Sequence, residues 1–86
     1  MTTTLRALGV PRSVTVLSAP DGTPCELTLT GARRHAVVAV RDDWRVQDLW
    51  WTDRAVDRHY FELVLDSGRL VTVYREITDA AWYAHT

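Results

Sequence analysis

The residue types that could carry a reaction are present in this chain, but their spacing matches none of the usual sites. Metal binding would need Cys25, His35, His59 and His85 to converge, and no pair of them has a spacing such as Cys-x2-Cys or His-x3-His. The serines lie outside any Gly-x-Ser-x-Gly turn, and there is no glycine-rich phosphate loop. We therefore expect no metal, no cofactor and no catalytic residue, and we predict that the protein is not an enzyme.

A group of aspartates around the middle of the chain is the clearest concentration of charge. Its members are Asp42, Asp43, Asp48, Asp53 and Asp57. Grouped carboxylates can bind magnesium or divide acid and base roles. Each of these has an arginine close by in the sequence, however, and exposed ion pairs are common and contribute under ~1 kcal/mol each. The pattern favours a solvated, self-neutralising charge network over a catalytic site.

Binding is the chemistry that the middle of the chain supports better. The segment from Trp44 to Phe61 holds three of the four tryptophans, and Trp, Tyr and Arg are enriched at protein–protein hot spots. The same side chains could stack bases of a single-stranded nucleic acid, as small β-barrels do. A third alternative is that the tryptophans only complete a small core. The candidate binding surface comprises Arg45, Trp50, Trp51, Arg54, Arg58 and Tyr60.

Charge helps to separate these alternatives. Ten basic residues, all of them arginine, are balanced by eleven acidic residues, for a formal charge of -1. A nucleic-acid groove normally shows as net basicity, so this balance favours a protein partner. A single-strand binder would instead bring six arginines to one face: Arg33, Arg34, Arg41, Arg45, Arg54 and Arg58.

The location expected for the protein is the cytoplasm, without a membrane contact. The single cysteine permits no internal disulfide, whereas small domains from oxidising compartments often carry several. The polar start of the chain lacks the apolar stretch of a signal peptide, and no apolar run approaches the ~20 residues of a transmembrane helix.

The elements that must position these residues are short β-strands. Eighty-six residues make one domain, with an arm over residues 1–12 that need not be ordered and a single β domain over residues 13–86. Tight turns are predicted at Asp21-Gly22 and Ser67-Gly68. Period-two alternation predicts strands near 13–17, 25–30, 33–40, 58–66, 70–77 and 82–84. We therefore predict an all-β fold, with about six short antiparallel strands in a meander that forms a small barrel or a strongly bent sheet.

The pattern also predicts which side chains face the core. Cys25 shares a strand face with apolar neighbours and is expected to be buried. The run 37–40 is apolar on both faces, which indicates a central strand. A bulge over 41–43 would return Trp44 and Val46 to the core side.

Later segments give further expectations. An irregular loop is predicted over 48–57, with one of Trp50 and Trp51 in the core and the other at least partly exposed, because adjacent residues on a strand face opposite ways. The core faces of the next two strands are predicted to contain Phe61, Leu63, Leu65, Val71, Val73 and Ile77. Tyr74 and Glu76 are expected on the opposite face.

Several motifs, taken in order, resemble a small bacterial domain family of uncharacterised function. They are Asp21-Gly22-x-Pro24, Gly31 before Arg34-His35-x-Val37, Trp44-Arg45 with Trp50-Trp51, Arg58-x-Tyr60-Phe61-x-Leu63, and Val73-Tyr74-Arg75-Glu76 with Trp82-Tyr83. The family occurs as short proteins and, in similar form, near the C-terminal end of ImuB-type proteins. Those proteins are catalytically inactive, Y-family-like polymerase subunits of an SOS mutagenesis cassette.

The resemblance implies a β-rich accessory module associated with translesion synthesis. Its partner would be a polymerase-like or RecA-like mutagenesis subunit, or DNA, and an unpaired edge strand could make a homodimer. The resemblance brings no catalytic residue. The chain departs from the family in having no polymerase-like region and in lacking a glycine at the turn Asp79-Ala80.

Overall fold

The fold is the antiparallel meander that the sequence predicted. The computed structural model describes residues 11–29, 33–48, 51, 53, 55–78 and 80–85. Within these residues the chain forms six strands and no helix: β1 (Pro11–Ser18), β2 (Pro24–Leu29), β3 (Arg34–Asp48), β4 (Val56–Leu65), β5 (Leu70–Glu76) and β6 (Trp82–His85). β1 begins at Pro11, two residues before the predicted start of the domain. The rest of the expected N-terminal arm lies outside the described residues.

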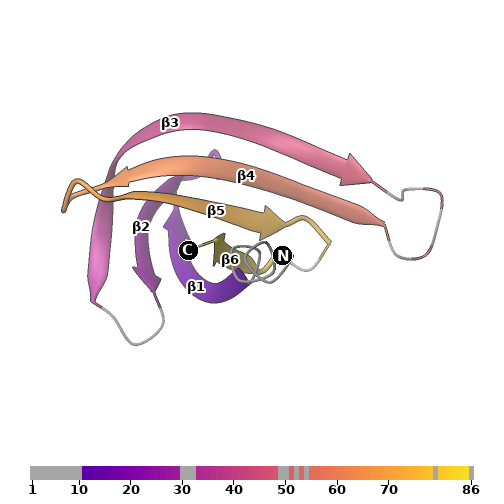
Figure 1. Cartoon of the computed structure of the whole chain (residues 1–86), viewed down its shortest axis with the longest axis horizontal. Coiled ribbons are helices and arrows are strands. Elements are labelled where there is room, and N and C mark those ends of the chain that lie inside the picture. Colours follow the sequence, from indigo (N-terminus) through magenta and orange to yellow (C-terminus); the bar gives the residue numbers. More distant parts are fainter. Residues whose placement is uncertain are drawn as a thin grey trace, which may run out of the picture.

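Backbone hydrogen bonds join the strands into a closed ring. The first part of β1 pairs with β6, from Pro11 opposite His85 to Ser13 opposite Tyr83, and the remainder of β1 pairs with β2. Each other strand pairs with the next one in sequence. Figure 1 shows the strongly bent sheet that results, with β1 and β6 curled beneath β4 and β5.

The core lies inside this ring and comes mainly from β4 and β5. Its buried side chains are Leu27, Phe61, Leu63, Leu65, Val71, Val73 and Ala84, and Val14, Val16, Leu29, Val37 and Trp82 pack against them. The predicted core face of β4 is therefore confirmed. Full burial of a leucine or valine side chain contributes about 1.5–3 kcal/mol, so this cluster is the main source of stability.

β3 differs most from the sequence-based expectation. Val38 is 61% exposed, so the prediction that the apolar run 37–40 marks a central, buried strand is wrong. The reason is that β3 pairs with β2 only from Ala36 back to Arg34, and beyond that it has β4 on one side alone. β3 is nevertheless the longest strand described, because β4 stays paired with it as far as Asp48.

The bulge predicted near Arg41 is present, but its expected effect is not. The register with β4 shifts between Val40 and Asp42, and a second shift lies between Val37 and Ala39. After these shifts Trp44 and Val46 lie on the outer side of the sheet, 41% and 36% exposed. The prediction that both residues rejoin the core is wrong, because each inserted residue reverses the faces and the second shift cancels the effect of the first.

A bulge also explains why Cys25 is exposed rather than buried as predicted. Leu17 pairs with Glu26, whereas Ser18 pairs with Pro24, so Cys25 is an extra residue on β2 with no partner residue on β1. This bulge puts Pro24 in the buried position and directs Cys25 outward.

Three tight turns contain residues in the left-handed region. Gly22 and Gly68 have φ of +91° and +86°, which confirms the two predicted turns. In the turn between β5 and β6, Ala80 has φ of +60°. The alanine therefore occupies a conformation for which glycine is the usual residue.

Candidate functional site

The β3–β4 hairpin is the most exposed part of the described structure. Asp42 to Asp48 pairs without interruption with Glu62 back to Val56. β5 follows β4 only as far as Arg58, so the hairpin runs past the other strands, as Figure 1 shows. Alternate residues of a strand face opposite sides, which gives the hairpin an outer face continuous with the surface and an inner face continuous with the core.

The outer face carries a row of aromatic side chains that crosses four strands. In register, Trp44 on β3 lies opposite Tyr60 on β4, which lies opposite Tyr74 on β5 and then Tyr83 on β6. The centroids of the Trp44 and Tyr60 rings are 5.4 Å apart with an interplanar angle of 2°. Tyr60 and Tyr74 are 5.0 Å apart, and Tyr74 and Tyr83 are 5.3 Å apart. We call these four residues the aromatic row.

Packing within the row buries one member and leaves another open. Tyr74 is on the face opposite the core, as predicted, yet it is only 3% exposed because its neighbours and the edge of His85 cover it. This burial raises the pKa of the Tyr74 hydroxyl. Trp44, at the end of the row, is 41% exposed. The row is thus anchored at Tyr74 and offers its free end to solvent.

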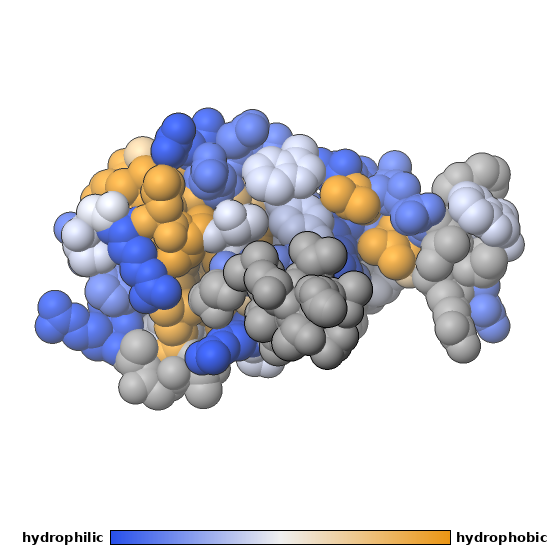
Figure 2. Space-filling view, in the orientation of Figure 1, coloured by the Kyte–Doolittle hydropathy of each residue, from blue (hydrophilic) through white to orange (hydrophobic). Residues whose placement is uncertain are grey.

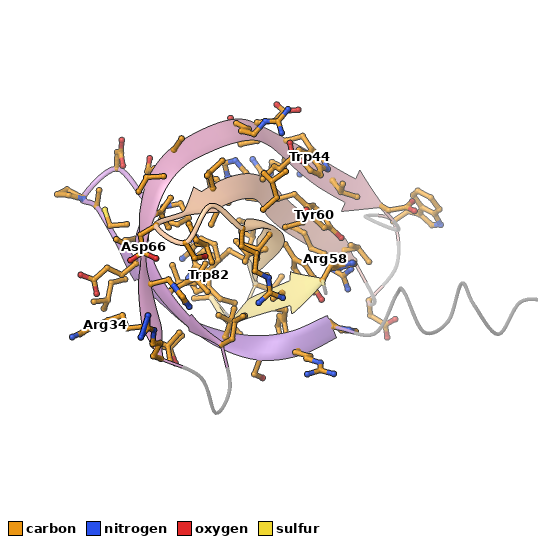
Figure 3. All side chains as sticks on the ribbon, turned by 60° about the vertical axis from the view of Figure 1, so that its left-hand side comes forward. Arg34, Trp44, Arg58, Tyr60, Asp66 and Trp82 are labelled. Carbon is orange, nitrogen blue, oxygen red and sulfur yellow. The ribbon has the colours of Figure 1, made fainter. Side chains whose placement is uncertain are left out.

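Arg58 fixes the middle of the row. Its guanidinium carbon lies 4.6 Å from the centroid of the Tyr74 ring, its Nε donates to Glu76 at 2.6 Å, and Nη1 donates to the Tyr60 hydroxyl at 3.4 Å. Burial disfavours the charge, but the hydrogen bonds to Tyr60 and Glu76 outweigh it, and the pKa of Arg58 is raised. Figure 3 shows Trp44, Tyr60 and Arg58 near one another, with Trp82 apart from them toward the middle of the ring.

The inner face of the hairpin is polar and internally neutralised. Nε and Nη2 of Arg45 donate to the two carboxylate oxygens of Asp57 at 2.8 and 2.7 Å. This pairing lowers the pKa of Asp57 and raises that of Arg45. Next to it, Nε2 of His59 lies 2.7 Å from a carboxylate oxygen of Asp43. A self-neutralising network is present, as predicted, although its partners come from opposite strands rather than from adjacent positions in the sequence.

A cavity of about 420 Å³ lies where the inner face meets the ring. It is lined by Asp21, Gly22, Thr23, Val40, Asp43, His59, Phe61 and Arg75. Among the described residues, no three His, Cys, Asp or Glu side chains come close enough together to hold a metal ion.

The structure divides the predicted binding surface. Arg58 and Tyr60 lie together on the outer face, whereas Arg45 lies on the inner face. Trp51, between the two strands of the hairpin, is 63% exposed. Trp50 and Arg54 lie outside the described residues. Trp51 fits the prediction that one tryptophan of the pair is exposed, whereas the prediction that the other lies in the core stays a prediction.

The sequence pattern does not identify two contributors to the outer face, because it predicts Trp44 and Val46 in the core. The register of β3 with β4 sets Trp44 opposite Tyr60, and Val46 follows on the same face. Figure 2 shows hydrophobic residues exposed along this hairpin as well as at the opposite end of the molecule.

The arginines do not converge as a single-strand groove would require. Arg34 lies near Glu26 at the other end of β3, with 3.5 Å between Nε and the carboxylate, and Figure 3 shows it far from Trp44. Arg41 approaches Glu62 at 4.0 Å. In the described part of the chain, the arginines named in the prediction are thus distributed over both faces and both ends.

The described residues include no helix long and apolar enough to cross a membrane. Comparison with family models, curated proteins and solved structures finds no match for this chain.

Proposed function

We propose that this chain is a non-enzymatic interaction module that binds a protein partner through the outer face and tip of the β3–β4 hairpin. The observation that carries the proposal is the exposed Trp44 ring stacked on Tyr60 within a fixed aromatic row. Val46 lies on the same face nearer the tip, and Trp51, between the two strands, is also exposed. Aromatic side chains held in place before binding lose little entropy on contact, which is typical of interface hot spots.

The charges around this surface favour a protein over a phosphate backbone. Arg58 is paired with Glu76, and Arg45 with Asp57, so neither offers an unneutralised charge to a phosphate. Nucleic-acid affinity depends strongly on such charges. An aromatic centre surrounded by internally paired polar groups is instead the arrangement of a protein–protein interface.

The partners to test first come from the sequence resemblance. A polymerase-like or RecA-like subunit of an SOS mutagenesis system would make the chain a cytoplasmic accessory protein of translesion synthesis. A patch with Trp44 at its centre requires an apolar pocket or groove on such a subunit.

Single-stranded nucleic acid is the alternative ligand, and the exposed indole ring of Trp44 favours it. The outer face of Trp44 is open, and a base could stack on it with a contribution of about 1–3 kcal/mol. This alternative needs phosphate contacts from arginines that exchange their present carboxylate partners.

Calorimetric titration distinguishes a protein partner from a nucleic-acid ligand. Purified mutagenesis subunits and single-stranded DNA are each titrated into the protein, at low and at higher salt. The proposal predicts that a subunit binds and that Trp44→Ala weakens binding about ten-fold or more. The matched control is Leu17→Ala, which removes a side chain of similar exposure from β1 and should leave binding unchanged.

Two results would count against the proposal. Binding to DNA that weakens steeply with salt and is lost in Trp44→Ala would make the nucleic acid the primary ligand. Subunit binding that is equally strong in wild type and Trp44→Ala would place the contact on another surface.

A further inference from the structure

Among the described residues, one edge of β3 has no strand beside it beyond Ala36. On the side away from β4, the described residues provide a partner only for Arg34 to Ala36, through β2. From Asp42 to Asp48 the strand is regular, because its register with β4 is continuous there. In such a strand alternate residues direct their N–H and C=O groups away from the existing partner. Figure 1 shows this edge as the outer rim of the molecule.

This edge carries few of the devices that prevent strand addition. Proteins protect exposed edges with proline, lysine, bulges or unpaired charges pointing inward. The run from Asp42 to Asp48 has neither proline nor lysine, and both bulges come before it. Its inward-facing Asp43 and Arg45 are already paired with His59 and Asp57 of β4. β3 also carries four large hydrophobic residues that are exposed: Val38, Val40, Trp44 and Val46.

We propose that this edge pairs with the same edge of a second copy, antiparallel and centred on Trp44. In that register Asp43 lies opposite Arg45 of the second copy, and Arg45 opposite its Asp43. The cross-strand pairs already present then extend into a row of alternating charge on the inner face, from His59 and Asp43 to Arg45 and Asp57 of the second copy. On the outer face the two Trp44 side chains lie opposite each other, and aromatic cross-strand pairs of this kind stabilise a sheet.

Charge selects this register over its neighbours. A two-fold axis perpendicular to the sheet pairs each outer-face residue with an outer-face residue of the second copy. The axis must therefore lie midway between one residue and the same residue of the second copy. Centring on Asp42, Asp43 or Arg45 sets that residue against its own copy, and like charges directly opposite are destabilising. Centring on Val46 leaves a shorter overlap without an Asp–Arg pair. The Trp44 register is the one in this run that makes two opposite-charge pairs.

Pairing of this kind would join two hairpins into one continuous sheet. The outer face would then present two aromatic rows related by the two-fold axis. The inference does not depend on the proposed function, because it concerns only the chain and its copy.

The experiment uses charge reversal and mixing. Asp43→Arg and Arg45→Asp each place like charges opposite one another across the axis. We expect sedimentation equilibrium to give twice the chain mass for the wild type and the single-chain mass for each variant. An equimolar mixture of the two variants should regain the double mass, because every opposed pair then has opposite charges.

Controls distinguish lost pairing from lost folding. Arg69→Asp changes the charge of an exposed residue outside β3 and should stay dimeric. Thermal unfolding checks that each variant is folded. If either reversal variant does not fold, Trp44→Asp serves in its place, since it sets two carboxylates against each other at the axis and should also give a monomer. A wild type that is monomeric at every concentration, or folded variants that stay monomeric when mixed, would overturn the proposal.

Discussion

Arg58 is of a residue type that is common at contact sites, but its contacts stabilise the fold. Its guanidinium lies over Tyr74 and is hydrogen-bonded to Glu76 and Tyr60. We expect Arg58→Met to lower the free energy of unfolding by about 1–2 kcal/mol, since it removes charged hydrogen bonds and a cation–π contact in a partly buried position. The matched variant Arg45→Met breaks a more exposed pair and should lower the free energy of unfolding less than Arg58→Met does. Urea denaturation measures both, and equal losses would refute the distinction.

Three aspartates make the stability of the fold depend on pH in the acid range. Hydrogen bonds from Thr23, Arg45 and His35 respectively lower the pKa values of Asp21, Asp57 and Asp66. A carboxyl whose folded pKa lies below its unfolded pKa stabilises the fold fully above the unfolded value. This contribution is lost as the pH falls through the folded value.

The urea midpoint should therefore decline as the pH is lowered below about 4. Asp66→Asn should be less stable at neutral pH and should show a smaller decline, since one of the three groups no longer titrates. A decline of the same size in wild type and variant would show that Asp66 does not contribute.

At the scale of the elements, the turns offer a paired test of backbone strain. Ala80 and Gly68 both have positive φ, and a side-chain Cβ at Gly68 would meet no atom within 4 Å. We expect Gly68→Ala to lower the free energy of unfolding by about 1 kcal/mol through backbone conformation alone. Ala80→Gly should raise it by up to ~1 kcal/mol, because relief of the left-handed conformation exceeds the added entropy of the unfolded chain. Thermal unfolding measures both changes, and a loss of stability in Ala80→Gly would contradict this reading.

The strand β4 supplies the centre of the core. Leu63 is fully buried, so Leu63→Ala should cost about 2–5 kcal/mol. Leu70, at the start of β5, is 48% exposed, and Leu70→Ala should change stability by only about 0.5 kcal/mol. Denaturant midpoints of the two variants compare the same chemical change at the two sites. Similar losses would mean that the core is not centred on β4.

Alternation predicted β4 and β5 well and failed on β2 and β3, for a physical reason. β4 and β5 pair with each other in unbroken register, so period two holds along them. In β2 one inserted residue reverses inside and outside, and in β3 a second shift cancels the effect of the predicted one, so the pattern predicts the wrong environment for Cys25 and Trp44. Sequence alone gives no register between strands, and the register is what aligns Trp44, Tyr60 and Tyr74.

The candidate site was predicted only in part for the same reason. Residue types place Arg58 and Tyr60 in the candidate surface, and the structure sets them side by side on the outer face. They also included Arg45, which alternation places on the other side of the hairpin. The burial of Tyr74 could not be predicted from β5 alone, since its cover comes from two other strands, β4 and β6.

At the scale of the whole molecule, the ring provides stability and the β3–β4 hairpin provides exposed surface. The residues that hold the core face inward from β2, β4, β5 and β6. The exposed aromatic and apolar residues of β3 lie along this strand and belong to no part of the buried core. This separation means that the proposed contact residues can be replaced without removing core side chains, so binding and folding can be tested apart.

The most direct test of the proposed function is site-specific photocrosslinking in the cells that produce the protein. A photoreactive amino acid replaces Val46 on the outer face of the hairpin or, as a matched control, Leu17 on β1. We predict that the Val46 position crosslinks to one other protein, that the Leu17 position does not, and that the crosslink is lost when Trp44→Ala is added. Equal crosslinking from both positions, or crosslinking from Val46 to nucleic acid alone, would contradict the proposal that this hairpin is a protein-binding surface.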